Sequence, residues 1–342
     1  MTMQGRRAFL QTLSVLGGGA ALASGIGIPG RARAAVPLMP ITLGEAKGAG
    51  QSAQFALGIR EGIFKAHHLD ATLKLFDSGA AMGPALVAGS LSIIATGDIP
   101  AIPIFSAGAP VKALCPLSDF SSDQAIVVSK KISKATDLEG RKIALFKGSV
   151  ASLLIEQYMR RNGGDISKVH LINMPPPQQL AALAAGEIDG YVSWEPFIWT
   201  GVKRIPGAHV LARGNEPHHY IHVFDLLVVR DDYLKSHANE IRDLLASLAT
   251  ALEMLRNASP AQMAHIAEDI RAVEKINLPT EVLVGMMKKR RYTMTIDKTF
   301  IAAQATNTKF LKGMGKIGKE IPVTSWLDTG PLRAVRPDLV KI

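Results

Sequence analysis

Residues 142–172 read KIALFKGSVASLLIEQYMRRNGGDISKVHLI and decide the fold class. The apolar run at 142–146 predicts a strand, and the Gly-Ser pair after it opens a helix that reaches about residue 161. Two glycines at 163–164 end this helix, and 169–172 predicts the next strand. A strand, a helix and a strand at this spacing predict a parallel β-α-β unit.

The same alternation extends in both directions along the chain. It predicts further strands near residues 41–43, 71–76, 92–95, 111–114, 125–128 and 188–192, and helices near 53–64, 79–88 and 175–186. This pattern is typical of an α/β fold with mostly parallel, doubly wound sheets. The last third differs, because apolar residues over 241–255 form one helical stripe, and 262–273 and 298–311 also predict helices. We therefore expect an α/β region followed by a largely helical tail.

Composition limits the classes of function. The chain has 342 residues, 47% of them hydrophobic, and a formal charge of +10. Its single cysteine, Cys115, excludes an internal disulfide and every multi-cysteine metal site, and its apolar surroundings predict a buried, inert thiol. The densest basic run, 288–291, is expected to form a solvated helix face, and nothing around it supports nucleic-acid binding.

The first 34 residues have the pattern of an export signal. Arg6-Arg7 precede an uncharged stretch over 10–28, and Ala32-Arg33-Ala34 offers small residues at the positions that a signal peptidase reads. The order Arg-Arg-x-Phe-Leu resembles a twin-arginine signal. An uncleaved anchor helix is the alternative, and the five glycines of the stretch argue against it. We expect cleavage after Ala34 and a protein located in the periplasm.

Three junctions between a predicted strand and the next helix place Gly beside Ser or Thr: Ser78-Gly79, Thr96-Gly97-Asp98 and Gly148-Ser149. Such a junction presents unpaired backbone N–H groups at a helix N-terminus, where the helix dipole favours an anion. No P-loop pattern and no closely flanking Arg accompany them, so these neutral donors suit a sulfonate or nitrate better than a phosphonate dianion. The alternative is that these residues only build turns and caps.

Five segments, in order and spacing, carry a resemblance to a known family. They are 60–65 with 69–70, 88–92, 96–100, 137–149, and 185–190 with 194–197. Together they resemble the periplasmic solute-binding proteins for aliphatic sulfonates, taurine and nitrate, which are receptors of ABC importers. Two departures are Ser92, where the family has Asp, and His67-His68, where Lys-x-Gly is commoner.

This resemblance implies a type II periplasmic-binding-protein fold, with two α/β lobes, two crossover strands and a ligand cleft between the lobes. The crossovers are expected at 124–129 and 223–229. Lobe one would then comprise 36–123 plus 229–342, and lobe two 124–228. Closure of the lobes on a ligand would be a hinge motion.

The resemblance also implies a ligand site in the cleft. The expected residues are Gln51, Ser78, Gly79, Thr96, Gly97 and Asp98 from lobe one, and Gly148, Ser149, Trp194 and Glu195 from lobe two. Gly148 and Ser149 would donate to the anion, and Trp194 would cover its apolar part. Glu195 would accept an amine or repel dianions if it faces the cleft, and would have no such role if it faces solvent. For Asp98, helix capping alone is an equal explanation.

The leading function is a binding protein that hands an aliphatic sulfonate, or a taurine-like zwitterion, to an ABC permease with its ATPase. A monomer is expected, with no cofactor, no metal and no nucleic acid. Receptors for nitrate, a pyrimidine or an aromatic acid are alternatives. A zinc site formed by His218 and His222, which would make a hydrolase, is a further alternative, although no third ligand is apparent nearby. We favour instead a histidine that faces the cleft and hydrogen-bonds the anion, or a plain surface segment. An enzyme on the same two-lobed fold is the alternative class, and the export signal argues against it.

Overall fold

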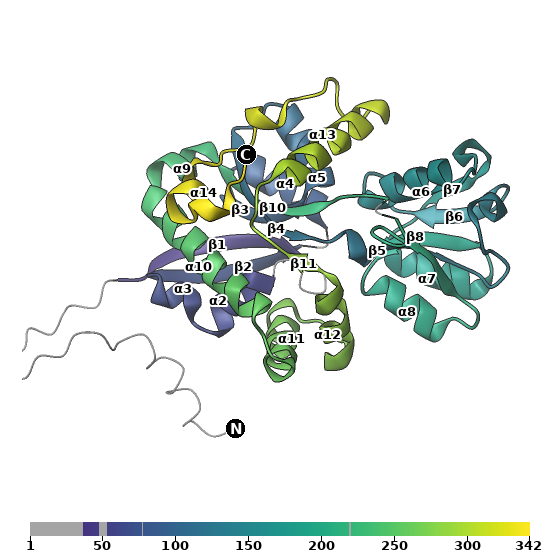
Figure 1. Cartoon of the computed structure of the whole chain (residues 1–342), viewed down its shortest axis with the longest axis horizontal. Helices are drawn as coiled ribbons and strands as arrows, with labels where there is room; N and C mark the ends of the chain where they lie inside the picture. Colours follow the sequence, from purple (N-terminus) through teal and green to yellow (C-terminus); the bar gives the residue numbers. More distant parts are fainter. Residues whose placement is uncertain (1–36, 48–52, 77, 219) are drawn as a thin grey trace, which may run out of the picture. The chain divides into compact units, whose positions relative to one another are not determined.

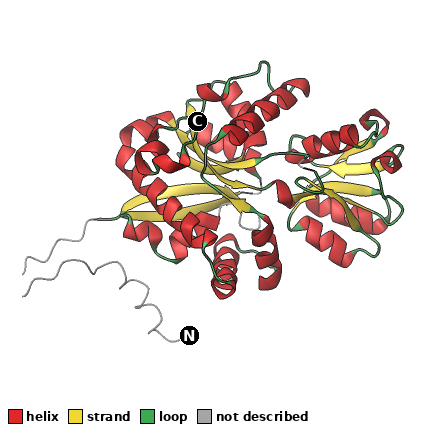
Figure 2. Cartoon of the chain, viewed as in Figure 1, coloured by secondary structure: helices red, strands yellow, loops and turns green. Residues whose placement is uncertain are grey.

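The described part of the chain contains two β-sheets, each flanked by helices. The computed structural model describes residues 37–47, 53–76, 78–218 and 220–342. Figure 1 labels the elements along the chain, and Figure 2 separates helices from strands. Within these residues, no helix has both the length and the apolar character that a membrane span needs.

The first sheet has six strands in the order β11-β4-β10-β3-β1-β2. These strands are β1 (Met39–Ala46), β2 (Leu69–Phe76), β3 (Ile93–Gly97), β4 (Val111–Asp119), β10 (Phe224–Arg230) and β11 (Arg291–Tyr292). Its helices are α2 (Ala53–Arg60), α3 (Ile63–Ala66), α4 (Gly79–Val87) and α5 (Asp98–Ser106), followed by α9 (Asp231–Ser236), α10 (Ala238–Arg256), α11 (Pro260–Glu274), α12 (Thr280–Lys289), α13 (Lys298–Gly313) and α14 (Gly330–Val335). We call this sheet and its helices lobe one.

The second sheet has five strands in the order β7-β6-β8-β5-β9. These strands are β5 (Gln124–Val128), β6 (Lys142–Leu145), β7 (His170–Asn173), β8 (Gly190–Trp194) and β9 (His209–Arg213). Its helices are α6 (Val150–Arg161), α7 (Pro176–Ala185) and α8 (Phe197–Arg204). We call this sheet and its helices lobe two.

The two sheets share one topology. In lobe one, β1 is parallel to β2 and β3, and β10 lies between β3 and β4, antiparallel to both. In lobe two, β6 is parallel to β7 and β8, and β5 lies between β8 and β9, antiparallel to both. Both sheets are thus mixed, but four strands of each run in one direction, so the expectation of mostly parallel sheets holds for strand direction. The strand that follows a crossing, β10 or β5, runs in the opposite direction, and in lobe one the two-residue β11 also pairs antiparallel with β4.

The chain crosses between the sheets twice, and the two crossing segments lie side by side. β4 leads into β5 through the short 3-10 helix η1 (Ser121–Asp123), and β9 leads into β10 through residues 214–223. The Phe120 N–H donates to the Val223 carbonyl at 3.1 Å. These two segments are the connections about which the lobes could rotate.

The two expected crossover strands, 124–129 and 223–229, correspond to β5 (Gln124–Val128) and β10 (Phe224–Arg230), the strands that directly follow the two crossings. β10 pairs with β3 and β4 along its length, so its residues belong to the sheet of lobe one. The boundary expected at residue 228 would instead assign most of this strand to lobe two.

The buried apolar residues follow the periodicity of the sequence. In β5, Ile126 and Val128 belong to the cluster that contains the buried face of α6, whereas Ala125 and Val127 pack with residues of α7 and α8. Helices thus cover both faces of this sheet because consecutive side chains of a strand point to opposite faces.

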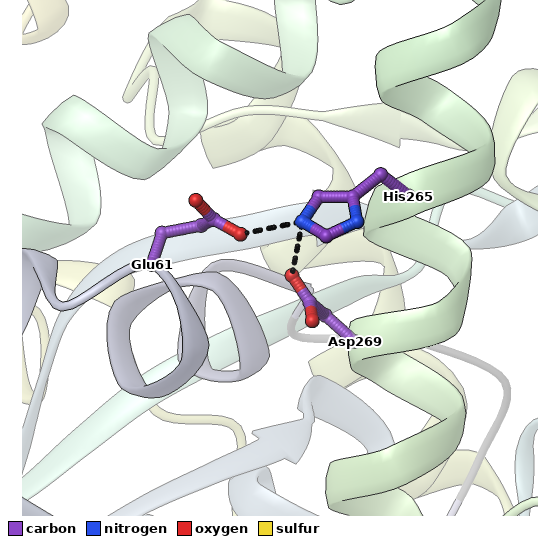
Figure 3. A group of neighbouring side chains, drawn as sticks. All are labelled: Glu61, His265 and Asp269. Carbon is purple, nitrogen blue, oxygen red and sulfur yellow. Dashed lines mark hydrogen bonds and ion pairs between the residues drawn. The ribbon is translucent and has the colours of Figure 1, made fainter. Parts of the chain in front are cut away.

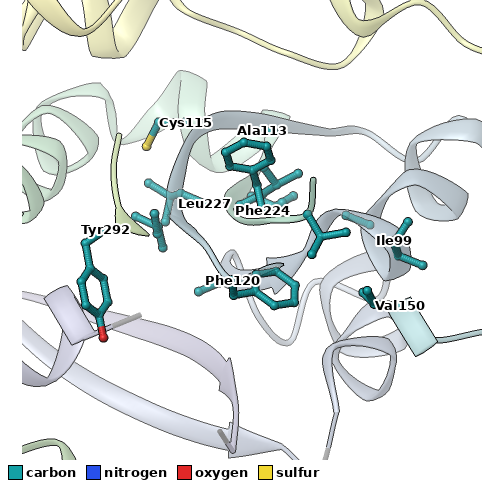
Figure 4. Packing of buried hydrophobic residues seen from close by; sticks show 14 of the residues in the cluster. Ile99, Ala113, Cys115, Phe120, Val150, Phe224, Leu227 and Tyr292 are labelled. Atoms are coloured by element: carbon teal, nitrogen blue, oxygen red, sulfur yellow. The ribbon is translucent and has the colours of Figure 1, made fainter. Parts of the chain in front are cut away.

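Lobe one has a core built from long strands and the helical tail. Cys115 of β4 lies opposite Leu227 of β10, and both appear in the packing view of Figure 4. The helical stripe predicted over 241–255 is confirmed, since its leucines are buried within α10. The single helix expected over 53–64 is instead two helices, because Gly62 adopts a φ of 71° between them.

Candidate functional site

Helix α4 begins at the first of the predicted anion loops. Ser78 is its N-cap, and the Ser78 Oγ accepts a hydrogen bond from the Ala81 N–H at 3.3 Å. A Cβ added to Gly79 would lie 2.5 Å from the Thr96 Oγ1, so only glycine fits at this position. The Thr96 Oγ1 is buried and has no hydrogen-bond partner among the described residues. The structure therefore places three predicted site residues from two loops next to one another.

Asp98 is a buried carboxylate at the start of α5, where Gly97 is the N-cap residue. Its Oδ1 accepts from the Ile99 N–H at 2.8 Å, and its Oδ2 accepts from the Phe224 N–H at 3.0 Å. The side-chain amides of Gln304 and Asn307 also donate to Oδ2, each at 2.9 Å. These bonds join α5 to β10 and α13. Burial raises the pKa of Asp98 to about 7, and the hydrogen bonds oppose only part of that rise.

Gly148 and Ser149 form the corresponding end of α6 in lobe two. Gly148 has a φ of 86°, in the left-handed region that glycine tolerates. Ser149 is the N-cap, with its Oγ accepting from the Ala151 N–H at 3.3 Å and donating to the Phe146 carbonyl at 2.7 Å. Because the Ser149 hydroxyl is engaged within the loop, the donors that α6 offers to an anion are its first backbone N–H groups.

Trp194 and Glu195 lie at the end of β8. The rings of Trp194 and Phe197 meet edge to face, with centroids 6.1 Å apart. The Glu195 Oε1 lies 3.2 Å from an Arg213 guanidinium nitrogen, and its Oε2 accepts from the Trp199 N–H at 2.9 Å. Glu195 is buried, so it does not face solvent, and both of its oxygens have partners within lobe two.

A cavity of about 320 Å³ lies where α4, α5 and α13 of lobe one meet the start of α6. Its walls are mostly apolar, with Pro100 and Ile104 of α5 among them, and Lys316 brings a positive charge to its lining. Gly148 lines it from lobe two. Of the other predicted residues, Gly79 is close to the wall, since its added Cβ would lie 3.1 Å from the Pro100 Cγ.

The remaining predicted residues are placed differently. Of the predicted site residues that the structure describes, only Gly148 lines this cavity, and the residues that do not are Ser78, Gly79, Thr96, Gly97, Asp98, Ser149, Trp194 and Glu195. Gln51 lies outside the described residues. The geometry therefore brings together the ends of α4 and α6, while the roles of the other residues in ligand binding stay predictions.

Sequence reasoning missed a buried ion pair at the first crossing. Arg290 directly follows α12 and pairs with Asp123 of η1, and the Arg290 side chain is 1% exposed. The expectation of a solvated helix face over 288–291 is therefore wrong for Arg290, although Lys288 and Lys289 are exposed. No signal in the basic run itself distinguishes the buried residue, because all four side chains carry the same charge.

His218 and His222 do not belong to the group of potential metal ligands that the described residues bring together. His218 is exposed, and its ring meets the Tyr220 ring edge to face at 6.2 Å. The group of metal-ligating side chains that the structure does bring together lies elsewhere and contains neither His218 nor His222.

Cys115 is buried in β4, as expected. Burial raises the pKa of its thiol far above the usual range, which disfavours the thiolate that nucleophilic chemistry needs.

Comparison with known proteins identifies relatives. A model of the NMT1-like family matches residues 36–271. The taurine-binding periplasmic protein of Escherichia coli is 27% identical over 252 residues, which are 71% of this chain and 77% of that protein.

Solved structures share the fold at lower identity. The periplasmic aliphatic sulphonate binding protein SsuA of Escherichia coli superposes with a TM-score of 0.70 at 21% identity, covering 84% of this chain and 91% of that one. The desulfurization enzyme DszB superposes with a TM-score of 0.67 at 15% identity, covering 87% and 99%. The two-lobed periplasmic-binding-protein fold is thereby confirmed, and since an enzyme shares it, the fold alone does not decide between binding and catalysis. Because the family model covers more than half of the sequence, the chain belongs to the NMT1-like family.

Proposed function

We propose that this chain is the extracytoplasmic substrate-binding component of an ABC importer and that its substrate is an aliphatic sulfonate. One observation carries the proposal: the cavity between α4, α5 and α6 combines an apolar wall with the Lys316 ammonium and the Gly148 backbone. The apolar wall suits an alkyl chain, while the ammonium and the helix end suit a monoanionic head group. The relatives named for taurine and aliphatic sulphonate support the same class of substrate.

Within this proposal, each lobe contributes one helix N-terminus. Ser78 and Gly79 belong to the N-terminus of α4, with Thr96 of β3 beside them, and Gly148 and Ser149 belong to the N-terminus of α6. Their backbone N–H groups and the Thr96 hydroxyl are the donors that suit a sulfonate. Gln51 of the first loop, Gly97 with Asp98 at the start of α5, and Trp194 over the apolar part complete the proposed site.

The environment of Glu195 bears on the choice between an alkanesulfonate and taurine. Arg213 already balances the charge of Glu195 inside lobe two. A taurine amine would have to compete with this guanidinium for the carboxylate. We therefore place an alkanesulfonate before taurine, and before nitrate, which would leave the apolar wall of the cavity without a partner.

The location of the protein and its interaction with a permease follow from the same proposal. The twin-arginine-like signal at 1–34 lies outside the described residues; it would direct the chain to the periplasm. There a monomer would close its lobes about the two crossing segments and present the loaded form to an ABC permease with its ATPase.

The test of the substrate is a thermal-shift and calorimetric panel on the purified chain. Ethanesulfonate, taurine, nitrate, bicarbonate and benzoate are compared at equal concentrations. A ligand present at 100 times its Kd should add about 2.7 kcal/mol to the free energy of unfolding. We expect the largest shift with ethanesulfonate, and the absence of any shift with sulfonates would remove this substrate class.

The test of the site is a pair of variants. Lys316→Met removes the charge from the cavity while keeping a long side chain, and should weaken ethanesulfonate binding about 10- to 100-fold, the usual value of a charge-assisted hydrogen bond. Lys319→Met is the matched control, since Lys319 is exposed and does not line the cavity. Trp194→Ala should weaken binding as well. Unchanged affinity in Lys316→Met would refute this location of the site, and unchanged affinity in Trp194→Ala would remove Trp194 from the proposed site.

A further inference from the structure

The turn between α2 and α3 lies against α11 and brings together one histidine and two carboxylates (Figure 3). His265 and Asp269 are one helical turn apart on α11, and Glu61 directly follows α2. The His265 Nε2 lies 2.9 Å from the Glu61 Oε1 and 3.7 Å from the Asp269 Oδ2. One ligand atom from each residue lies within 4.8 Å of the other two, an arrangement that the described residues contain once.

Asp269 is a buried carboxylate with one unused oxygen. Its side chain is 3% exposed, and its Oδ1 is bound by the Arg60 Nε at 3.1 Å. Its Oδ2, which points towards His265 in Figure 3, is buried and accepts no hydrogen bond from an N–H or hydroxyl donor of the described residues. Burial is the main cause that raises the pKa of Asp269, and the neighbouring Glu61 adds to it, while Arg60 and His265 oppose it. A buried oxygen of this kind is unfavourable unless a donor or a cation reaches it.

A protonated His265 can donate its Nε2 hydrogen to only one of the two neighbouring carboxylates. The Nε2 carries one hydrogen, which the 2.9 Å contact with Glu61 already uses. At 3.7 Å, the Asp269 Oδ2 is beyond hydrogen-bond distance from the same nitrogen. Ligands of a tetrahedral zinc ion, bound at about 2.0–2.2 Å, stand about 3.3–3.5 Å apart, which falls between the two observed separations.

We propose that Glu61, His265 and Asp269 bind a divalent transition-metal cation, with Zn²⁺ as the best fit, and that the cation ties α11 to the α2–α3 turn. One imidazole nitrogen and two carboxylate oxygens are donors that Zn²⁺ accepts, whereas Mg²⁺ and Ca²⁺ prefer oxygen donors alone. Water would complete the coordination on the exposed side. Arg60, through its bond to the Asp269 Oδ1, orients the buried ligand.

The two outer ligands have room to adjust to a cation. The His265 side chain is 62% exposed and the Glu61 side chain 31% exposed. This site shares no residue with the cavity at the meeting of the lobes. Its occupancy is therefore independent of the substrate proposed above, and either proposal can fail without the other.

The experiment is calorimetric titration of the untagged, EDTA-treated and dialysed chain with ZnCl₂, together with its melting temperature with and without Zn²⁺. We expect one equivalent to bind and the melting temperature to rise. His265→Ala and Glu61→Gln should each weaken Zn²⁺ binding at least about tenfold and abolish the rise. His170→Ala is the control, because it removes an exposed imidazole from β7 in lobe two and should leave both results unchanged.

Two results would overturn the proposal: failure of the unaltered chain to bind Zn²⁺, or binding that is unchanged in both His265→Ala and Glu61→Gln. Urea unfolding of each variant without metal checks that it is folded. Because the two variants alter different elements, a folding defect in one leaves the other as the test.

Discussion

Two buried carboxylates, Asp98 in lobe one and Asp123 at the first crossing, are balanced by different partners. The described partners of Asp98 are all uncharged: two backbone N–H groups and the amides of Gln304 and Asn307. Asp123 pairs with the buried guanidinium of Arg290. Neutral donors offset only part of the cost of burying a charge, which is why the pKa of Asp98 rises to about 7.

The two sets of partners determine how easily each carboxylate takes up a proton. A carboxylate held by amides can take up a proton within the folded protein, because its neighbours carry no charge that opposes protonation. A carboxylate held by a guanidinium stays charged as long as the pair is intact. The hydrogen bonds by which Asp98 connects α5 to β10 and α13 are therefore sensitive to pH. The ion pair of Asp123 and Arg290, which connects the helical tail to the first crossing, stays charged.

The largest expected effect comes from breaking the ion pair. Arg290→Met should lower the free energy of unfolding by about 3–5 kcal/mol, because it leaves the Asp123 charge buried without its cation. Urea unfolding followed by circular dichroism measures this loss. Adding Asp123→Asn should recover much of it. A loss below about 1 kcal/mol, or no recovery in the double variant, would show that the pair is not what balances Asp123.

Removing the carboxylate of Asp98 should have the next largest effect. Asp98→Ala leaves two backbone N–H groups and two amides without their acceptor, and we expect a loss of about 2–4 kcal/mol. Asp137→Ala is the control, because Asp137 also accepts bonds from backbone N–H groups but is only partly buried. Equal losses in the two variants would mean that burial at residue 98 does not matter.

Per pH unit, the smallest effect is the pH dependence of the Asp98 contribution. Between about pH 4 and pH 7 the folded protein retains the Asp98 proton and the unfolded chain loses it, so the unfolded state binds fewer protons. The stabilisation is therefore complete below about pH 4 and is lost as the pH rises to about 7, by at most about 1.4 kcal/mol per pH unit.

Asp98→Asn isolates this dependence, because the amide does not titrate. The free energy of unfolding of the unaltered chain minus that of the variant should fall as the pH rises from 5 to 7. The contributions of the other titrating groups cancel in this difference, because both proteins contain them. A difference that is constant or rises over this range would contradict an elevated pKa for Asp98.

Most of the fold could be predicted from local patterns. Strands and helices follow from apolar periodicity and from glycines that end helices, so β6, α6 and β7 appear where residues 142–172 indicate. The direction of β5 and β10 could not be predicted, because a buried strand has the same apolar pattern whether its neighbours run parallel or antiparallel. The split between α2 and α3 was also missed, because apolar residues continue past Gly62.

The candidate site was less predictable than the fold. The caps at Ser78 and Ser149 follow from local sequence, since a cap is made by residues a few positions apart. The contact of Gly79 with Thr96, and the bonds of Asp98 to Gln304 and Asn307, depend on segments far apart in the chain. The Lys316 side chain carries no sequence signal that separates it from other exposed lysines, and only the packing of α13 places it at the cavity.

The position of β10 has a consequence for the order in which the two lobes can fold during synthesis. A ribosome completes every strand of the second sheet, through β9 at Arg213, before it reaches β10 at Phe224. Until then, β3 and β4 lack the strand that lies between them. The lobe that begins first during synthesis is therefore the one that finishes last, and its unfilled central position must stay free of other strands while lobe two is translated.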